Sequence, residues 1–278
     1  MKKFLSLVVI ASVIYLSSTA QTLQTPRPSP PQYVKQDFGL SYIELSYSRP
    51  AVRGRKIFGD LVPYGKVWRT GANNATTLTF ADDVIIGGAK VPAGKYGLLT
   101  IPGENEWTII ISKQTDVTNP ADYKQDQDLV RVPVKSQSLP YPVESMTISF
   151  DNVASNTCDL GLRWSNTLVS LPIKTEIDSK IMDQINTAMN KDNRPYYSAA
   201  LYYIDNGKDL NKALEWLNKA GEQDPKAFYV FYQKARAQAM LGKKQEAIQT
   251  AQQSIQLAKE AKNSDYVSLN EKLIASLK

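Results

Sequence analysis

The spacing of apolar residues changes once along this chain, near residue 175. Before that point apolar side chains alternate with polar or small ones, as at Ile43 and Leu45. This period of two is typical of a strand with one buried face. After that point Ile177 and Ile181 begin a series that recurs every three to four residues, which is typical of an amphipathic helix. The chain is therefore predicted to contain a β part followed by an α part.

Short apolar runs separated by glycine and proline fill residues 33–173. Gly87 and Gly88 separate the run Val84–Ile86 from Val91, and a Gly-Gly pair favours a two-residue hairpin turn with positive φ angles. Many short strands joined by such turns predict an antiparallel β-sandwich of the jelly-roll kind.

The last third of the chain contains two related units. The corresponding small residues are Ala200, Gly207 and Ala213 in the first unit, and Ala235, Gly242 and Ala247 in the second. A unit of about 34 residues, with small residues where helices cross and Gly in the turn, resembles a tetratricopeptide repeat. We therefore predict a connecting helix within 174–193 and a tetratricopeptide-like α-helical domain at 194–278.

Two repeat units need further helices to cover their apolar faces. The helix predicted at 177–190 and a last helix near 264–277 are expected to supply this cover. The apolar face of the last helix is predicted to consist of Tyr266, Leu269, Leu273 and Leu277.

The N-terminus is predicted to be a signal peptide covering residues 1–20. Lys2 and Lys3 precede an apolar run, Phe4–Leu16, and small residues end at Ala20. The run is shorter than the span of about 20 apolar residues that a membrane helix needs. The protein is therefore expected to be periplasmic or secreted, without a membrane span once the signal is removed. Residues 21–32 are rich in proline and predict an extended linker.

Charge and composition exclude several classes of function. The formal net charge of +6 includes the two lysines of the signal segment, and the remainder is too small for a nucleic-acid binder. The chain has no His and one Cys, which excludes His-dependent triads and His or thiolate zinc sites. No phosphate loop or dinucleotide glycine pattern occurs, and no cofactor is expected.

Two further motifs are expected to be structural. Cys158 shares the alternating apolar face of a predicted strand with Leu160, Leu162 and Trp164, so it is interpreted as an inert core thiol. Asp122, Asp126 and Asp128 lack the glycine and the terminal acid of a calcium loop. We interpret these three residues as a solvated loop, and no metal site is predicted.

The best candidate site is the stretch Ser48–Thr76, which is rich in Arg, aromatic and amide side chains. Its candidate ligand-binding residues are Arg53, Arg55, Tyr64, Trp68, Arg69, Asn73 and Asn74. The arginines offer planar donors to an anionic or glycan ligand, the aromatic rings offer stacking surfaces, and the amides adjust hydrogen bonds. The alternative is a structural plug in which Trp68 is core, Arg69 pairs with an acid such as Asp60, and Asn73 caps a turn. The sequence leaves both interpretations open.

A hydrolase remains the enzymatic alternative. A glycan-cleaving envelope enzyme would need two carboxylates within roughly 5–10 Å of each other. The candidates are Glu44, Asp60, Asp82 and Asp83.

A family resemblance covers residues 33–173, about half of the chain. It is carried by the segments YSRPAVRGRKIFGDLVPYGKVWRTGANNATTLTF and VIIGGAKVPAGKYGLLTIPGENEWTIIIS. They resemble the secreted bacterial family known as domain of unknown function 2911, and WRTGANNAT is the most specific part. The resemblance implies export and a helical tail, and it implies no catalytic residues.

Together these observations favour an exported, non-enzymatic binding or interaction protein. The sandwich would present the Ser48–Thr76 loop to a ligand. The helical repeats would hold a protein or peptide, because stacked repeats expose extended concave surfaces.

Overall fold

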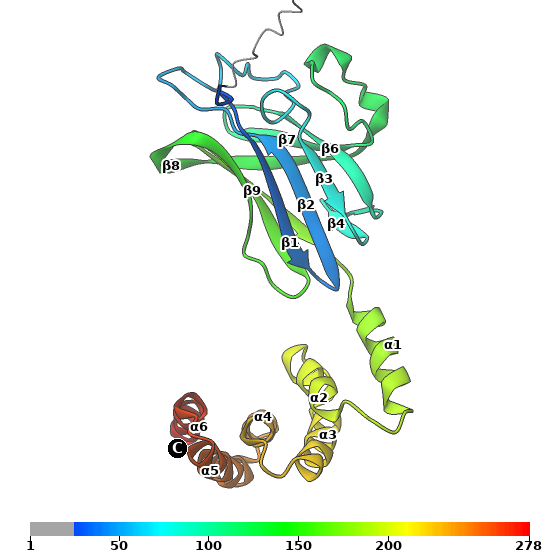
Figure 1. Cartoon of the computed structure of the whole chain (residues 1–278), viewed down its shortest axis with the longest axis vertical. Coiled ribbons are helices and arrows are strands. Elements are labelled where there is room, and N and C mark those ends of the chain that lie inside the picture. The colour runs from blue at the N-terminus through cyan, green and yellow to red at the C-terminus, as the bar shows by residue number, and fades with distance from the viewer. Residues whose placement is uncertain (1–24) are drawn as a thin grey trace, which may run out of the picture. The chain divides into compact units, whose positions relative to one another are not determined.

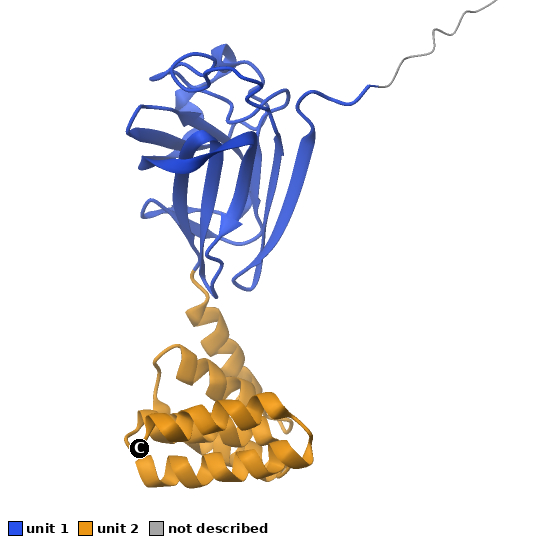
Figure 2. Cartoon of the chain, turned by 90° about the vertical axis from the view of Figure 1, so that its left-hand side faces the viewer, with its two compact units in different colours: residues 1–175 blue, residues 176–278 orange. Residues whose placement is uncertain are grey.

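A computed structural model describes residues 25–278 of the chain. The chain divides into two compact units between Thr175 and Glu176 (Figure 2). The first unit consists of strands with two short 3-10 helices, Pro120–Asp122 and Gln125–Gln127, and the second unit consists of α-helices, so the predicted β-then-α fold is confirmed. The predicted signal peptide at residues 1–20 lies outside the described residues. No helix in the described part of the chain is both long and apolar enough to cross a membrane.

Nine antiparallel strands form the first unit (Figure 1). They are β1 (Pro31–Phe38), β2 (Ser41–Ser48), β3 (Thr77–Phe80), β4 (Val84–Ile86), β5 (Ala89–Val91), β6 (Gly94–Ile101), β7 (Glu106–Ser112), β8 (Asp128–Asp151) and β9 (Thr157–Lys174). Their order in space is β1-β2-β3-β6-β7-β8-β9-β4-β5.

The long strand β8 belongs to both layers of the sandwich. Its first part, 128–135, pairs with β7, and its second part, 136–151, pairs with β9. The register between β8 and β9 shifts in two places, and such bulges bend strands that pass from one sheet to another. The core between the layers brings Ile43 and Leu45 of β2 together with Leu160 and Leu162 of β9.

Turn and edge residues define where the strands begin and end. Gly87 and Gly88 join β4 to β5 with φ angles of 59° and 81°, so the predicted hairpin turn is confirmed. β1 begins at Pro31, so the last two residues of the linker predicted at 21–32 belong to the sandwich. Proline is tolerated there because Pro31 is the first residue of an edge strand.

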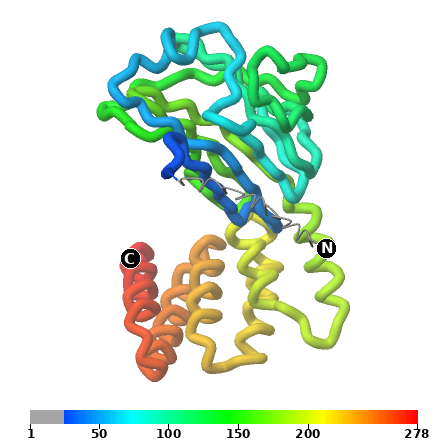
Figure 3. Tube along the Cα trace, turned by 45° about the horizontal axis from the view of Figure 1, so that its top comes forward, coloured from blue at the N-terminus to red at the C-terminus, as the bar shows by residue number. Residues whose placement is uncertain are grey.

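Six helices form the second unit. They are α1 (Asp178–Met189), α2 (Tyr196–Asp205), α3 (Leu210–Gln223), α4 (Phe228–Met240), α5 (Lys244–Glu260) and α6 (Ser264–Ser276). Figure 3 shows α2 to α6 as neighbouring rods in chain order, and each packs on the next.

The predicted repeat units correspond to α2–α3 and α4–α5. The four alanines at the predicted helix crossings, Ala200, Ala213, Ala235 and Ala247, are completely buried. Gly207 and Gly242 follow the ends of α2 and α4 with positive φ angles of 64° and 75°. A glycine in this conformation ends a helix without steric cost.

The apolar face predicted for the last helix is wrong at Leu269, which is 38 % exposed. The neighbouring Asn270 is completely buried instead. Its amide nitrogen lies 2.9 Å from Ser254 Oγ of α5, and that hydroxyl donates to the carbonyl of Phe228 at 2.8 Å. A polar contact between helices thus rotates the buried face of α6 away from the one that the apolar residues suggested.

Candidate functional site

The loop between β2 and β3 is fixed to the sandwich at two points. Ala51 forms an antiparallel bridge with Ser145 of β8. Trp68 forms another with Thr100 of β6, in which the two N···O distances are 2.7 and 3.0 Å. Because β6 and β8 are both paired within the sandwich, the two bridges hold the loop in a defined conformation.

Four aromatic rings from this loop and from two strands form a cluster. Phe58 and Trp68 come from the loop, Trp107 from β7 and Trp164 from β9. The indoles of Trp68 and Trp164 stack with a centroid distance of 5.8 Å and an interplanar angle of 18°. Phe58 contacts all three indoles edge-on. Trp68 is 9 % exposed and Trp164 is 1 % exposed. The indole of Trp68 therefore belongs to the core, as the alternative of a structural plug predicted.

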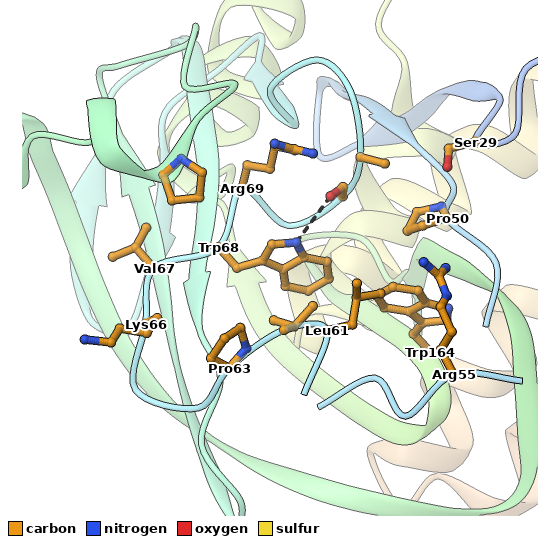
Figure 4. A pocket seen from close by; sticks show the side chains of 14 residues that line it. Ser29, Pro50, Arg55, Leu61, Pro63, Lys66, Val67, Trp68, Arg69 and Trp164 are labelled. Carbon is orange, nitrogen blue, oxygen red and sulfur yellow. Dashed lines mark hydrogen bonds between the residues drawn. The ribbon is translucent and has the colours of Figure 1, made fainter. Parts of the chain in front are cut away.

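A pocket of about 370 Å³ opens beside this cluster. Its walls are Ser29, Pro50, Arg55, Leu61, Val62, Pro63, Lys66, Val67, Trp68, Arg69, Gly71, Ala72, Pro120 and Trp164 (Figure 4). The volume is typical of a small-molecule site, and so is a mainly apolar wall with a few polar groups. The Trp68 indole N–H donates to the carbonyl of Gly71 at 3.2 Å (Figure 4), which holds the indole against the wall.

The charge of the pocket is positive. Arg55, Lys66 and Arg69 line it, and its walls contain no Asp or Glu. Arg55 is held by two backbone carbonyls, with Nε 3.0 Å from the oxygen of Val52 and Nη2 2.6 Å from that of Ala51. Neutral carbonyls orient a guanidinium but leave its charge uncompensated.

Arg69 has unused hydrogen-bonding capacity. Its Nη1 donates to the carbonyl of Thr118, and its Nε is buried without a hydrogen-bond partner. The pairing with Asp60 that the structural interpretation expected is absent from the hydrogen bonds and ion pairs of these described residues, because the loop places Arg69 beside the 118–120 segment. A buried donor without a partner costs about 1–3 kcal/mol.

Arg53 and Asn73 lie outside the pocket and bind the chain's own proline-rich segment. Arg53 Nη2 donates to the carbonyl of Pro28 at 3.2 Å. Asn73 Nδ2 donates to the carbonyl of Ser29 at 3.1 Å. The interpretation of Asn73 as a turn cap is therefore replaced by a contact with residues distant in sequence.

Tyr64 and Asn74 also lie outside the pocket walls, and both are exposed. The ring of Tyr64 covers Gly59, where an added Cβ would lie 2.8 Å from the ring. Of the seven predicted residues, the structure therefore brings Arg55, Trp68 and Arg69 together at one pocket.

Sequence reasoning missed the walls that come from distant segments. Trp164 was predicted only as a core residue of its strand, and Ser29 as part of a linker. Pro120 carried no signal at all. The alternation of apolar residues shows which face of a strand is buried, but not which loop covers the end of that strand.

The interpretation of Asp128 as part of a solvated loop is wrong. Its side chain is 5 % exposed, and Asp128 is the first residue of β8. It accepts a hydrogen bond from the Tyr123 hydroxyl, and Arg131 Nη1 lies 2.7 Å from its Oδ2. Burial, together with the adjacent carboxylate, raises the pKa of Tyr123 to about 12. In the described residues no three His, Cys, Asp or Glu side chains are grouped to hold a metal ion.

The carboxylates proposed for a hydrolase lie away from this pocket. Glu44 pairs with Lys35 at 3.3 Å, and Asp83 with Lys90 at 2.8 Å. Cys158 is buried, and burial raises the pKa of its thiol to about 12, so the thiol is protonated at neutral pH. The walls of the pocket therefore offer cations and apolar groups, without the pair of carboxylates that a glycan hydrolase needs.

Comparison with known proteins gives one match. A family model described as "Protein of unknown function (DUF2911)" matches residues 29–173. No curated protein and no solved structure matches the chain.

Proposed function

Because the chain belongs to DUF2911, a family of proteins of unknown function, we propose its function from its own geometry: an exported, non-enzymatic binding protein whose sandwich pocket takes a small anionic ligand. The family membership confirms the resemblance inferred from the sequence. The export is supported by the predicted signal peptide at residues 1–20, which lies outside the described residues.

The observation that carries the proposal is Arg69 in a pocket without acids. Its Nη1 donates to a neutral carbonyl and its Nε is buried without a partner, so no anionic group among the described residues compensates its charge. An anion in the pocket would compensate the charges of Arg55, Lys66 and Arg69 together. Hydrogen bonds to a charged group contribute about 1.5–3 kcal/mol each, so an anion would gain more here than a neutral molecule of the same shape.

The walls favour an anion with an apolar body over a glycan. Sugars stack on open aromatic faces, but Trp68 and Trp164 cover one another and retain 9 % and 1 % exposure. What remains accessible is a rim of Leu61, Pro63 and Val67 around the edge of the indole. Such a surface suits an aliphatic or aromatic group that carries a carboxylate, sulfonate or phosphate.

The helical unit supports a second binding role, toward a protein or peptide. Its helices α2, α4 and α6 carry half-buried aromatic pairs, with Tyr197 and Tyr229 at 5.1 Å and Tyr232 and Tyr266 at 5.5 Å. Aromatic side chains on stacked repeats are suited to holding an extended partner.

Two fluorescent probes test the pocket. 8-Anilinonaphthalene-1-sulfonate is an aromatic anion, and N-phenyl-1-naphthylamine has the same aromatic body without the sulfonate. We expect the anion to bind more tightly. Replacing Arg69 with Met should lower the affinity for the anionic probe by about tenfold or more. The affinity for the neutral probe should stay nearly unchanged.

Two lysines of the loop provide a matched control. Lys66 lines the pocket, whereas Lys56 is exposed on the same loop outside it. Lys66→Met should lower the affinity for the anionic probe by about two- to fivefold, and Lys56→Met should leave this affinity unchanged. Equal effects of the two substitutions, or equal affinity for the two probes, would overturn the anionic pocket.

A further inference from the structure

Three consecutive carbonyls of the N-terminal segment are held by the Ser48–Thr76 loop. Arg53 Nη2 lies 3.2 Å from the oxygen of Pro28, and Asn73 Nδ2 lies 3.1 Å from that of Ser29. The backbone N–H of Arg49 donates to the carbonyl of Pro30 at 2.9 Å. Residues 28–30, here named the strap, thus receive one donor per residue.

The composition of the strap suits this kind of binding. Pro28 and Pro30 have no N–H and a fixed φ angle, so the segment offers mainly acceptors and loses little entropy on docking. The side that receives it supplies only donors. This complementarity applies to residues that the sequence predicted as an extended linker.

The strap is part of the pocket, whereas the side chains that hold it are not. Ser29 lines the pocket, while Arg53 and Asn73 are absent from its walls. In Figure 4 Ser29 lies beside Pro50, at the side of the pocket away from Lys66 and Val67. Arg53 and Asn73 are therefore placed to act on a ligand through the strap.

We propose that Arg53 and Asn73 are positioning residues that hold the strap as a movable wall of the pocket, so that docking of the strap controls how long a ligand stays. The proposal rests on the proposed anionic pocket. The two side-chain bonds are exposed to solvent, so each is weak and the strap opens without unfolding of the sandwich. Because linkage is reciprocal, a bound ligand also favours the docked strap.

Asn73 and its neighbour Asn74 allow a matched test. Both are exposed asparagines, and Asn73 makes the bond to Ser29. Asn73→Asp removes the donor and keeps a residue that tolerates the φ angle of 58°. Asn74→Asp adds the same charge one residue away. Asn73→Gly removes the donor without adding charge.

The docking of the strap is measured separately from ligand binding. Arg27 is exposed beside the strap, and Arg27→Cys accepts a thiol-reactive fluorophore. Cys158 is buried and its pKa is raised to about 12, so it stays unlabelled in the folded protein. Fluorescence anisotropy of the label reports the mobility of the strap, and stopped-flow release of 8-anilinonaphthalene-1-sulfonate reports retention of a ligand in otherwise identical unlabelled variants.

We expect Asn73→Asp and Asn73→Gly to lower the anisotropy and to speed release of the anion by roughly three- to tenfold, the worth of one hydrogen bond. Asn74→Asp should change neither quantity, and the thermal midpoint should stay the same in all variants. A looser strap with unchanged release overturns the proposal and leaves the anionic pocket intact. Failure of the wild-type protein to bind the anion overturns both proposals.

Discussion

Trp68 stacks on Trp164 at a centroid distance of 5.8 Å, and this contact joins the β2–β3 loop to the strand β9. The indole of Trp68 therefore has both roles considered for the loop, that of a structural plug and that of a ligand-binding surface. Its ring completes the core of the sandwich, and its exposed edge forms a wall of the pocket. Binding and stability are coupled at this residue, and substitutions must separate them.

Trp68→Ala is expected to lower the free energy of unfolding by about 3–5 kcal/mol, as for other large core aromatic residues. The reason is the loss of contacts with Phe58, Trp107 and Trp164. Denaturation by urea measures the change. Tyr64→Ala on the same loop serves as the control, and its cost should be about 1 kcal/mol or less because Tyr64 is exposed. Equal costs for the two substitutions would contradict the core position of Trp68.

Asp128→Asn should lower the pKa of Tyr123 below its value of about 12. Burial is the largest cause of the raised pKa, and the hydrogen bond and charge of Asp128 add to it, so only the latter part should be lost. The folded-state pKa of the phenol exceeds the unfolded value of 10.0. Its contribution to stability is therefore complete below pH 10 and disappears as the pH rises toward 12.

Ultraviolet absorbance of tyrosinate measures this titration. Because the pKa of Tyr202 is also raised to about 12, the difference between the curves of the wild type and Tyr123→Phe identifies the part that belongs to Tyr123. The substitution of Asp128 should also cost roughly 2 kcal/mol of stability, because Arg131 loses its charged partner in a partly buried site. An unchanged titration curve in Asp128→Asn would show that the carboxylate has no part in the pKa of Tyr123.

Replacement of two glycines of the helical unit by alanine should change its stability in opposite directions. Gly242 has a φ angle of 75° after α4, where alanine costs about 1–2 kcal/mol. Gly221 lies inside α3, where an added Cβ would meet the ring of Phe231 at an ordinary 3.4 Å. Gly221→Ala should therefore stabilise by up to about 1 kcal/mol. Thermal unfolding followed by helical circular dichroism tests both, and a shift of the same sign in the two variants would contradict this account.

Acid should lower the stability of the helical unit, because it protonates the carboxyl group of Glu215. Hydrogen bonds from Lys219 and Lys212 lower the pKa of this carboxyl from 4.5 to about 2. A lowered folded-state pKa gives stability that is present above pH 4.5 and is lost as the pH falls toward 2. Glu215→Gln should reduce the fall in the helical unfolding midpoint between pH 5 and pH 2.5. The effect should be small, since all three side chains are exposed. An equally steep fall in the variant would rule out Glu215 as a source of acid sensitivity.

Local patterns in the sequence predicted most of the fold. The Gly87–Gly88 turn and the buried alanines at 200 and 235 depend on contacts within one hairpin or one pair of helices, so their signal lies in short stretches. Leu269 was misplaced because a single polar bond of Asn270 decided the orientation of α6. Hydrophobic periodicity does not include that kind of contact.

Only the part of the candidate site that lies within one stretch of sequence was predicted, because sequence patterns report local contacts. The loop supplies Arg55, Trp68 and Arg69 to the pocket, and these residues lie within one stretch of sequence. The carbonyl of Thr118 that holds Arg69 and the strap that Asn73 holds come from other segments. Backbone acceptors carry no residue-type signal, so no sequence pattern identifies them as partners.

The strand β8 shares its hydrogen bonds between β7 and β9. Loss of either layer would therefore leave the other layer covalently joined to an unpaired half of β8. A state with one sheet intact and the other melted would expose the common core and leave half of β8 unpaired, so it would be strongly disfavoured. The sandwich should consequently unfold in a single cooperative step, with hydrogen exchange equally slow at the protected amides of both sheets.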